Sequence, residues 1–388
     1  MNGWGSLQEY DPNFFRVDES WTNMKINKRK KHRWCFVKIM IKDRAFKGDP
    51  PENIEEVPYR PLTSYFNHAW KGLYRRAAQV VDYLISYEPS VTTTTKNFTH
   101  CINKHNEQYL QDISRIMEEN NLEFVEAMKR VPPIRIRTHD VKDFFTACNT
   151  DLALEFIQSR MSHYKAQGFN YFKIEDEKSF LKRLQVHDTT RKQIIRWSTV
   201  VDFGIEKPRR GITLQKSKPA RGTWISFKGL IAILKHDLGH VFIRSSGGIY
   251  RQTSGGPMGS PTMCAVANSF GCSEERRWRL NNRSTVLPRL HKRYVDDSFS
   301  ITYLRPNILD IFPDYSGCKL KETSEDKEFL GLEIGLLHER FITLRPKPQQ
   351  QWKVIPEGTT ITPQQKKGLD RGRLVRIKLN STHLQPEL

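Results

Sequence analysis

The sequence predicts an α+β fold in which helices back an antiparallel sheet. Two periodic patterns lead to this expectation. In residues 298–303, apolar side chains alternate with polar ones, which is typical of a strand with one buried face. In residues 66–85, apolar side chains recur at helical spacing and form one stripe, which is typical of an amphipathic helix. The chain of 388 residues is long enough for roughly two or three subdomains.

The N-terminal third is expected to contain one strand and three helices. We expect residues 1–30 to form a poorly ordered extension and residues Trp34 to Ile41 to form a strand. After the helix of residues 66–85, two further helical patterns are separated at Asn120-Asn121, where the polar pair favours a break.

A first candidate carboxylate closes the strand predicted over residues 134–140. In a strand, Ile134, Ile136 and Asp140 share one face. The alternation that anchors the strand in a core therefore carries Asp140 to its end. An aspartate at a helix N-terminus is the alternative interpretation.

Two more carboxylates, Asp296 and Asp297, lie in the run Arg-Tyr-Val-Asp-Asp-Ser-Phe. The alternation after them places the pair in or beside the tight turn of a hairpin. Adjacent carboxylates repel each other, so one would take up a proton unless a cation neutralised both. Mg²⁺ is the natural cation, since it takes carboxylate oxygens and leaves coordination sites open for phosphates. A solvated, inert Asp-Asp turn is the alternative.

A glycine-rich segment lies between these carboxylates along the chain. Gly255, Gly256 and Gly259 form a backbone that a nucleotide or base pair could approach closely. Ser260-Pro261 follows and is typical of a helix start.

Three segments, in this order, resemble motifs A, B and C of reverse transcriptases: Asp140-Val-Lys-Asp-Phe-Phe, Gln252-Thr-Ser-Gly-Gly-Pro-Met-Gly-Ser-Pro and Tyr294-Val-Asp-Asp. Within that family, the chain most resembles the Penelope-like retroelement branch, relatives of telomerase. Other segments resemble the primer-grip strand and two fingers motifs: Phe329 to Ile334, Val37 to Ile39, and Tyr59 to Ser64. The likeness spans about residues 35–376.

The resemblance implies a right-hand polymerase with fingers, a palm and a short, incomplete thumb. The expected division is an N-terminal extension (1–30), the fingers (31–130), a palm (131–345) with a basic insertion near 160–235, and a partial thumb with a basic C-terminal segment (346–388). About 40 residues follow Lys347, which is too few for a full thumb, a ribonuclease H domain or a GIY-YIG endonuclease. Integration is therefore expected to need a separate endonuclease.

The activity that the resemblance implies is RNA-templated DNA synthesis. A reverse transcriptase adds deoxynucleotides to a primer 3′-hydroxyl by two-metal phosphoryl transfer. By position, the metal-binding catalytic carboxylates are Asp140, Asp296 and Asp297. Val141 is expected to lend its backbone carbonyl to the second of two Mg²⁺ ions, with Mn²⁺ as an alternative ion.

The resemblance also assigns the substrate-binding residues. Lys38 and Arg60 are expected to hold the triphosphate, and Phe145 to exclude a ribose 2′-hydroxyl. Ordinary surface cations and a core aromatic ring are the alternatives at these three positions. The other expected contacts come from motif B and the primer grip: Gln252, Gly259 and Ser260, and Phe329, Leu330 and Gly331.

Two other functions stay open. A domesticated, maturase-like protein would bind structured RNA without polymerase activity; the short thumb favours it, and the complete carboxylate triad opposes it. An RNA-dependent RNA polymerase also uses paired aspartates, but Phe145 weighs against it. One departure from the family pattern is Gly255, where many reverse transcriptases place a glutamine.

The composition is consistent with a nucleic-acid partner. Lysine and arginine number 63 against 43 acidic residues, for a formal charge of +20, which attracts a phosphate backbone through counterion release. Basic runs include residues 207–221. The expected partners are an RNA template, a DNA or RNA primer and deoxynucleoside triphosphates.

The sequence also bears on the compartment. No apolar run approaches the ~20 residues needed to cross a bilayer, and the first residues resemble neither a secretory signal nor a transit peptide. The six cysteines include no Cys-x-x-Cys pair, so neither zinc nor a disulfide framework is indicated. A protein of the nucleus or of an organelle is expected (the mitochondrion, for an organellar gene), neither secreted nor in a membrane.

Overall fold

The computed structural model describes residues 15–16, 35–41, 59–65, 68, 70–92, 94–175, 211–245, 248–252, 255–282, 288–304, 312–323 and 328–346. The chain divides into two compact units. The first unit comprises Met1–Glu88 and Asp143–Ser273, and the second comprises Pro89–Lys142 and Glu274–Leu388. Helices and mainly antiparallel sheets occur in both units, which confirms the expected α+β class. The right-hand polymerase architecture stays a prediction.

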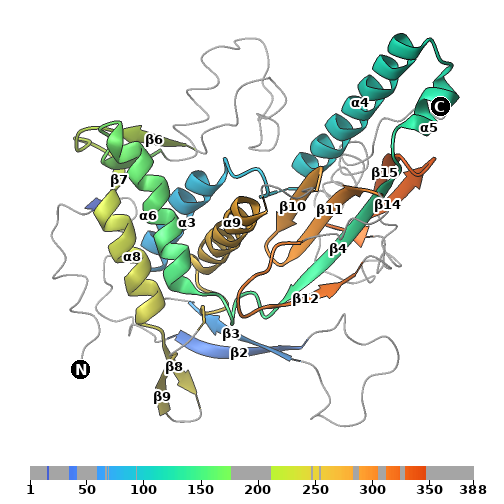
Figure 1. Cartoon of the computed structure of the whole chain (residues 1–388). Coiled ribbons are helices and arrows are strands. Elements are labelled where there is room, and N and C mark those ends of the chain that lie inside the picture. The colour runs from blue at the N-terminus through green and yellow to red at the C-terminus, as the bar shows by residue number, and fades with distance from the viewer. Residues whose placement is uncertain are drawn as a thin grey trace, which may run out of the picture. The chain divides into compact units, whose positions relative to one another are not determined.

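The second unit contains the sheet that carries the candidate carboxylates. All its neighbouring strands are antiparallel, and they lie side by side in Figure 1. Across the sheet the strands are β10 (Leu290–Tyr294), β11 (Asp297–Tyr303), β4 (Ile134–Lys142) and β12 (Lys319–Glu322). A separate antiparallel sheet follows, made of β13 (Glu328–Phe329), β14 (Leu332–Leu337) and β15 (Phe341–Pro346).

The core of the second unit joins both sheets to two helices, α4 (Thr95–Asn120) and α5 (Phe124–Arg130). The ring of Phe98 packs 4.9 Å from that of Phe299 and 4.8 Å from that of Phe329, centroid to centroid. Burying such a side chain contributes roughly 1.5–3 kcal/mol. The core therefore fixes β11, and with it the hairpin that precedes it.

The described part of the first unit contains two sheets, three complete helices and the first half of a fourth. One sheet has the order β1 (Phe15–Arg16), β7 (Thr223–Ser226), β5 (Tyr171–Ile174), β6 (Ile212–Gln215). The other has the order β3 (Tyr59–Ser64), β2 (Cys35–Ile41), β8 (Phe242–Ser245), β9 (Gly248–Arg251). The helices are α3 (Lys71–Ile85), α6 (Thr150–Ala166) and α8 (Phe227–Gly239). Helix α9 (Met263–Asn281) begins in the first unit and ends in the second.

Several local predictions are confirmed. The strand expected from Trp34 is β2, and the expected amphipathic helix is α3. Helix α4 ends at the predicted break, because Asn121 takes the left-handed conformation with φ 49°.

The expected domain ranges do not coincide with the two units of the structure. Helices α4 and α5 lie in the range expected for the fingers, and they belong to the same unit as the carboxylate strands. The stretch expected as an insertion contains β5, β6, β7 and most of α8, while residues 176–210 lie outside the described residues. The same holds for most of residues 1–30 and for 347–388. The predicted domain boundaries therefore stay predictions.

Among the described residues, no helix has the length and apolar character needed to span a membrane.

Candidate functional site

A two-residue turn joins β10 to β11 and carries the adjacent aspartates. Tyr294 pairs with Asp297 across the hairpin, which leaves Val295 and Asp296 as the turn residues. Val295 has φ 57°, a left-handed conformation that a β-branched side chain disfavours. Backbone of this kind costs of order 1–3 kcal/mol and persists where the surrounding structure enforces it. The predicted hairpin is confirmed.

The third carboxylate reaches the same end of the sheet from the neighbouring strand. Asp140 of β4 lies directly opposite Asp297 of β11 in the antiparallel register. The backbone N–H of Val141 donates to the carbonyl oxygen of Asp296 at 2.7 Å, which ties the turn to β4. The predicted strand over residues 134–140 is thereby confirmed, and it brings Asp140 next to the adjacent aspartates Asp296 and Asp297.

The electrostatics of this group are those of acids placed near one another. Desolvation, and then the charges of Asp296 and Asp140, raise the pKa of the Asp297 carboxyl to about 6. Asp297 keeps an exposed side, so the neighbouring carboxylates are the cause that the geometry supports best. Lys142 opposes this shift, and its ammonium donates a hydrogen bond to the Asp140 carboxylate.

The donor set suits a hard divalent cation. Carboxylate and carbonyl oxygens are the ligands that Mg²⁺ prefers, and mutual repulsion among the aspartates is relieved by a cation. In the part of the chain that the structure describes, no group of three His, Cys, Asp or Glu side chains is arranged so that it could hold a metal ion. The Lys142 ammonium instead lies on Asp140.

The glycine-rich segment of the first unit approaches the protein's own backbone. Gly255 and Gly259 have φ of 65° and 110°. A Cβ on either glycine would lie within 3.0 Å of a carbonyl oxygen, that of Thr146 or that of Thr63. At these two positions, the absence of a side chain lets the segment pack against the backbone of its own unit. The predicted contact with a nucleotide stays a prediction.

Ser260 follows Gly259 directly and is buried, with its hydroxyl on a carboxylate. Its hydroxyl and that of Thr262 donate to one oxygen of Asp237, and the Tyr65 hydroxyl donates to the other at 3.0 Å. Burial raises the pKa of Asp237, although the three hydroxyls act in the opposite direction. Sequence reasoning missed Asp237, since a single acid in a helical pattern carries no local signal. Helix α9 begins at Met263, two residues after Pro261.

Phe145 is half-buried in the turn after β4, and its carbonyl accepts from Gly256 N–H at 2.9 Å. Its ring lies edge-on to Phe144, with 6.2 Å between centroids. Phe144 is buried against Phe270, so the core interpretation holds for Phe144. The Gln252 N–H donates to the Val241 carbonyl at 3.0 Å.

Lys38 and Arg60 lie on the neighbouring strands β2 and β3, where Lys38 pairs with Leu62 and Arg60 with Met40. Their side chains are outside the described part of the structure. All the predicted substrate-binding residues belong to the first unit, whereas the aspartates and the predicted primer grip belong to the second.

The predicted primer grip is a hairpin turn between β13 and β14. Phe329 is buried in the core of the second unit. Leu330 and Gly331 form the turn, with φ of 54° and 70°. The Phe329 side chain therefore anchors the turn, and the backbone of Leu330 and Gly331 forms its tip.

A search of solved structures found similarity to telomerase. Apo telomerase from Candida tropicalis is 14% identical, with a TM-score of 0.41 over 78% of this chain and 46% of that chain. Telomerase from Candida albicans with the TWJ fragment of telomeric RNA is 12% identical, with a TM-score of 0.44 over 88% and 50%. The corresponding Candida tropicalis complex is 14% identical, with a TM-score of 0.46 over 89% and 49%.

The chain thus spans about half the length of these structures. No protein-family model and no curated protein matches it. All three TM-scores are below 0.5, and the function proposed below rests on the carboxylate geometry instead.

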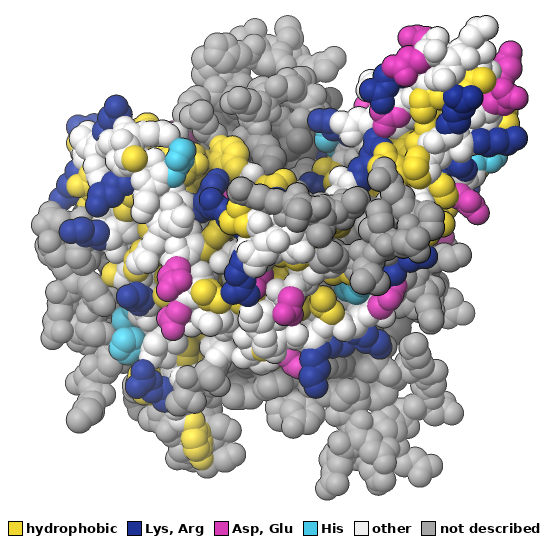
Figure 2. All heavy atoms as spheres, in the orientation of Figure 1, with side chains coloured by type: hydrophobic (Ala, Val, Ile, Leu, Met, Phe, Trp, Pro, Cys, Tyr) yellow, Lys and Arg dark blue, Asp and Glu magenta, His cyan; other side chains and the backbone are white. Residues whose placement is uncertain are grey.

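A basic surface lies on the first unit. Lys165, Lys216, Lys218 and Arg221 are exposed near β6 and β7, and Figure 2 shows dark blue side chains gathered over this part of the unit. The Lys218 ammonium lies 5.2 Å from the Trp224 ring centroid, and the Lys216 ammonium 5.7 Å from that of Phe169. We call these four cations the β6–β7 basic surface.

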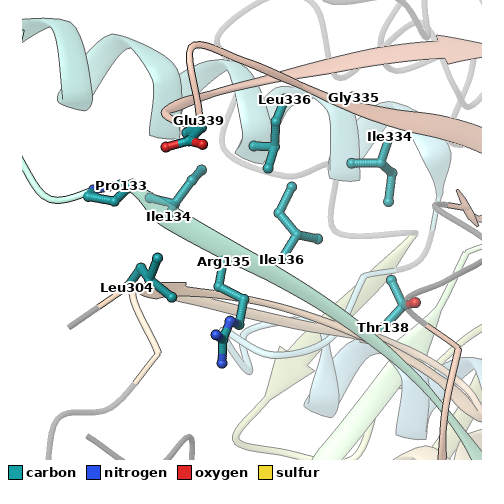
Figure 3. A pocket seen from close by; sticks show the side chains of 10 residues that line it. All are labelled: Pro133, Ile134, Arg135, Ile136, Thr138, Leu304, Ile334, Gly335, Leu336 and Glu339. Atoms are coloured by element: carbon teal, nitrogen blue, oxygen red, sulfur yellow. The ribbon is translucent and has the colours of Figure 1, made fainter. Parts of the chain in front are cut away.

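A cavity of about 610 Å³ lies beside the first half of β4 (Figure 3). Ile136, Ile334 and Leu336 face one another across it, while Arg135 points to the other side of the strand. None of the sequence-predicted site residues lines this cavity. It is therefore separate from the candidate site.

Proposed function

We propose that the chain is an RNA-templated DNA polymerase, a reverse transcriptase that adds deoxynucleotides to a primer 3′-hydroxyl. The observation that carries this proposal is the pairing of Asp140 with Asp297 on adjacent strands, beside a turn that holds Asp296. A protein that only binds RNA gains nothing from clustered carboxylates, because they repel phosphate. The ordered resemblance of the motifs to reverse transcriptases, and within them to the Penelope-like branch, supports the same function.

Asp140, Asp296, Asp297 and the Val141 carbonyl would hold Mg²⁺, with Mn²⁺ as an alternative. When bound, two such ions lower the pKa of the attacking hydroxyl and neutralise charge on the leaving pyrophosphate. The chain's own contribution is positional. The register holds Asp140 against Asp297, and the Val141 N–H fixes the turn that carries Asp296.

The remaining residues would bind the substrates. Lys38 and Arg60 would pair with the triphosphate, and Phe145 would exclude a 2′-hydroxyl. The backbone of the turn that contains Leu330 and Gly331 would support the primer terminus. Ser260 would act through Asp237, by holding the glycine-rich segment in place. Gln252 and Gly259 would contact the template or the nucleotide through that same segment.

The proposed partners are an RNA template, a DNA or RNA primer and deoxynucleoside triphosphates. The β6–β7 basic surface would bind phosphates of the template or the duplex. The proposed location is the nucleus, with an organelle as the alternative for an organellar gene.

The test is primer extension by the purified chain on an RNA template with an annealed DNA primer and Mg²⁺. The Asp296→Ala/Asp297→Ala variant should lose incorporation. The Asp314→Ala variant, which removes an exposed carboxylate from the same unit, should keep it. A wild-type chain that binds RNA with steep salt dependence and incorporates nothing would instead identify a maturase-like RNA-binding protein. Incorporation of ribonucleotides alone would identify an RNA-dependent RNA polymerase.

A further inference from the structure

A fully buried ion pair lies directly behind the aspartate turn, within the second unit. Glu275 comes from α9 and Arg293 from β10, and neither side chain is accessible to solvent. The Arg293 Nε atom donates to Glu275 Oε1 at 2.5 Å. Complete burial alone would raise the pKa of Glu275, but the Arg293 guanidinium overcomes this effect and lowers it. Both partners are therefore charged.

The same guanidinium reaches the turn. Its terminal nitrogen donates to the carbonyl oxygen of Val295 at 3.0 Å. Val295 is the left-handed residue immediately before Asp296. A planar guanidinium can bond two acceptors at once in a fixed geometry, which the single nitrogen of a lysine cannot reproduce. Arg293 thus couples the Glu275 carboxylate to the strained backbone that presents the aspartates.

The glutamate is itself fixed on its other sides. The Tyr315 hydroxyl donates to Glu275 Oε1 at 2.8 Å, and the Ser90 hydroxyl donates to Glu275 Oε2. The backbone of Arg293 is held as well, since its N–H donates to the Ser90 carbonyl at 2.7 Å and its carbonyl accepts from Thr92 at 2.9 Å. The pair, which joins α9 to β10, is therefore held by Tyr315 and by the segment before α4.

Stability alone is a poor reason for this arrangement. Taking two charges out of water costs about as much as their attraction returns, so a buried pair replaced by apolar residues is often no less stable. Here one partner, Arg293, also hydrogen-bonds the aspartate turn. Orienting that turn is therefore the better explanation for the buried pair. The reaction rate falls steeply when catalytic groups are misplaced.

We propose that Glu275 and Arg293 are positioning residues, which hold the Val295 carbonyl and thereby fix the orientation of Asp296 and Asp297. This inference rests on the proposed function for its catalytic consequence, but not for its effect on the turn. Neither residue touches substrate; both act through the backbone of Val295.

The test compares two variants with a matched control in the full chain. Arg293→Lys keeps the charge and loses the second donor nitrogen. Glu275→Gln keeps the shape of the side chain and loses its charge. Glu274→Gln removes the neighbouring acid, which pairs with Arg277 instead. Hydrogen exchange of residues 294–298, melting temperature and single-nucleotide incorporation are measured for each.

Arg293→Lys and Glu275→Gln should speed exchange at 294–298 more than elsewhere in the chain. They should also lower kcat about 100-fold, since misplaced catalytic groups cost about that much, and leave KM for the deoxynucleotide nearly unchanged. Glu274→Gln should change neither quantity. Unchanged exchange and kcat in both variants would overturn the proposal. So would a uniform loss of stability, or unfolding of both variants, because the pair would then only stabilise the fold.

The two proposals fail separately. A wild-type chain without incorporation removes the polymerase function, while selective exchange at 294–298 still supports the positioning of the turn. Normal wild-type incorporation, with variants that match it, removes the positioning role and leaves the polymerase function intact.

Discussion

Asp297 at the start of β11 lies directly opposite Asp140 of β4, so two carboxylates share one end of a sheet although 156 positions separate them (297 − 140 − 1). Asp296 adds a third acid in the adjoining turn, which Val141 holds by a backbone hydrogen bond. The folded state therefore maintains repulsion among like charges, which a cation bound there would relieve.

Asp297→Asn should raise the melting temperature in metal-free buffer, because it removes this repulsion. The gain should be a few degrees, since about 1 kcal/mol corresponds to ~2–4 °C in a domain of this size. Mg²⁺ should then stabilise the wild type and not the variant, because only a ligand of the folded state raises stability. Calorimetry with and without Mg²⁺ checks both points, and Asp314→Asn is the control. A wild-type melting temperature that is insensitive to Mg²⁺ contradicts the proposed metal site.

Lys142→Met should tighten Mn²⁺ binding. The Lys142 ammonium lies on the Asp140 carboxylate and competes there with any other cation. Its removal should lower the Kd for Mn²⁺ by about tenfold, since each 1.4 kcal/mol of lost competition is a factor of ten. Electron paramagnetic resonance of free Mn²⁺ measures the Kd. Lys129→Met on α5, which is exposed in the same unit, should leave it unchanged.

Phe145→Ala should admit ribonucleotides. If the half-buried ring excludes the 2′-hydroxyl, its loss should lower the preference for deoxynucleotides over ribonucleotides by about tenfold or more, as expected for a steric contact worth ~1–3 kcal/mol. Competing dNTP and rNTP incorporation measures this ratio. Phe144→Ala is the contrasting variant, because Phe144 is buried. It should cost ~3–5 kcal/mol of stability and leave the ratio unaltered.

Asp237→Asn should flatten the dependence of stability on pH. Burial holds the pKa of Asp237 above its ordinary value of 3.8, so the folded state binds the proton more tightly than the unfolded state. The resulting stability is present below pH 3.8 and is lost as the pH rises through the raised folded-state pKa. Denaturant titrations from pH 4 upward should show this loss in the wild type and not in the variant, which cannot ionise. An equal slope in both would refute the assignment.

Charge reversal of the β6–β7 basic surface should weaken RNA binding. Lys216→Glu, Lys218→Glu and Arg221→Glu together should reduce affinity and lower the slope of log K against log salt, because each lost phosphate contact removes about 0.7–0.9 from the slope. Fluorescence anisotropy with a single-stranded RNA at several salt concentrations measures both quantities. Reversal of an equal number of exposed cations on α4 and α5, Lys104, Lys129 and Arg130, is the control. An equal loss in the control would show that net charge alone drives binding.

Local periodicity was enough to predict β4, the β10–β11 hairpin, β2, α3 and the break at Asn121. These elements depend on alternation, helical spacing and turn residues, which neighbouring positions determine. The same information predicted Asp140 at the end of its strand, and Asp296 and Asp297 in or beside the hairpin turn. Their assignment to a metal site and to a polymerase stays a prediction.

Only the tertiary structure decided how the buried acids are used. Glu275 is followed in the sequence by two arginines, Arg276 and Arg277, yet its carboxylate is buried against Arg293. Asp237 likewise meets Ser260 only after folding. Pairs of this kind form between side chains that become buried together. That burial depends on packing between residues that are far apart in sequence. The sequence by itself thus placed the carboxylates at the ends of their strands, and the packing of α9 and α8 decided what holds the turn and the glycine-rich segment in place.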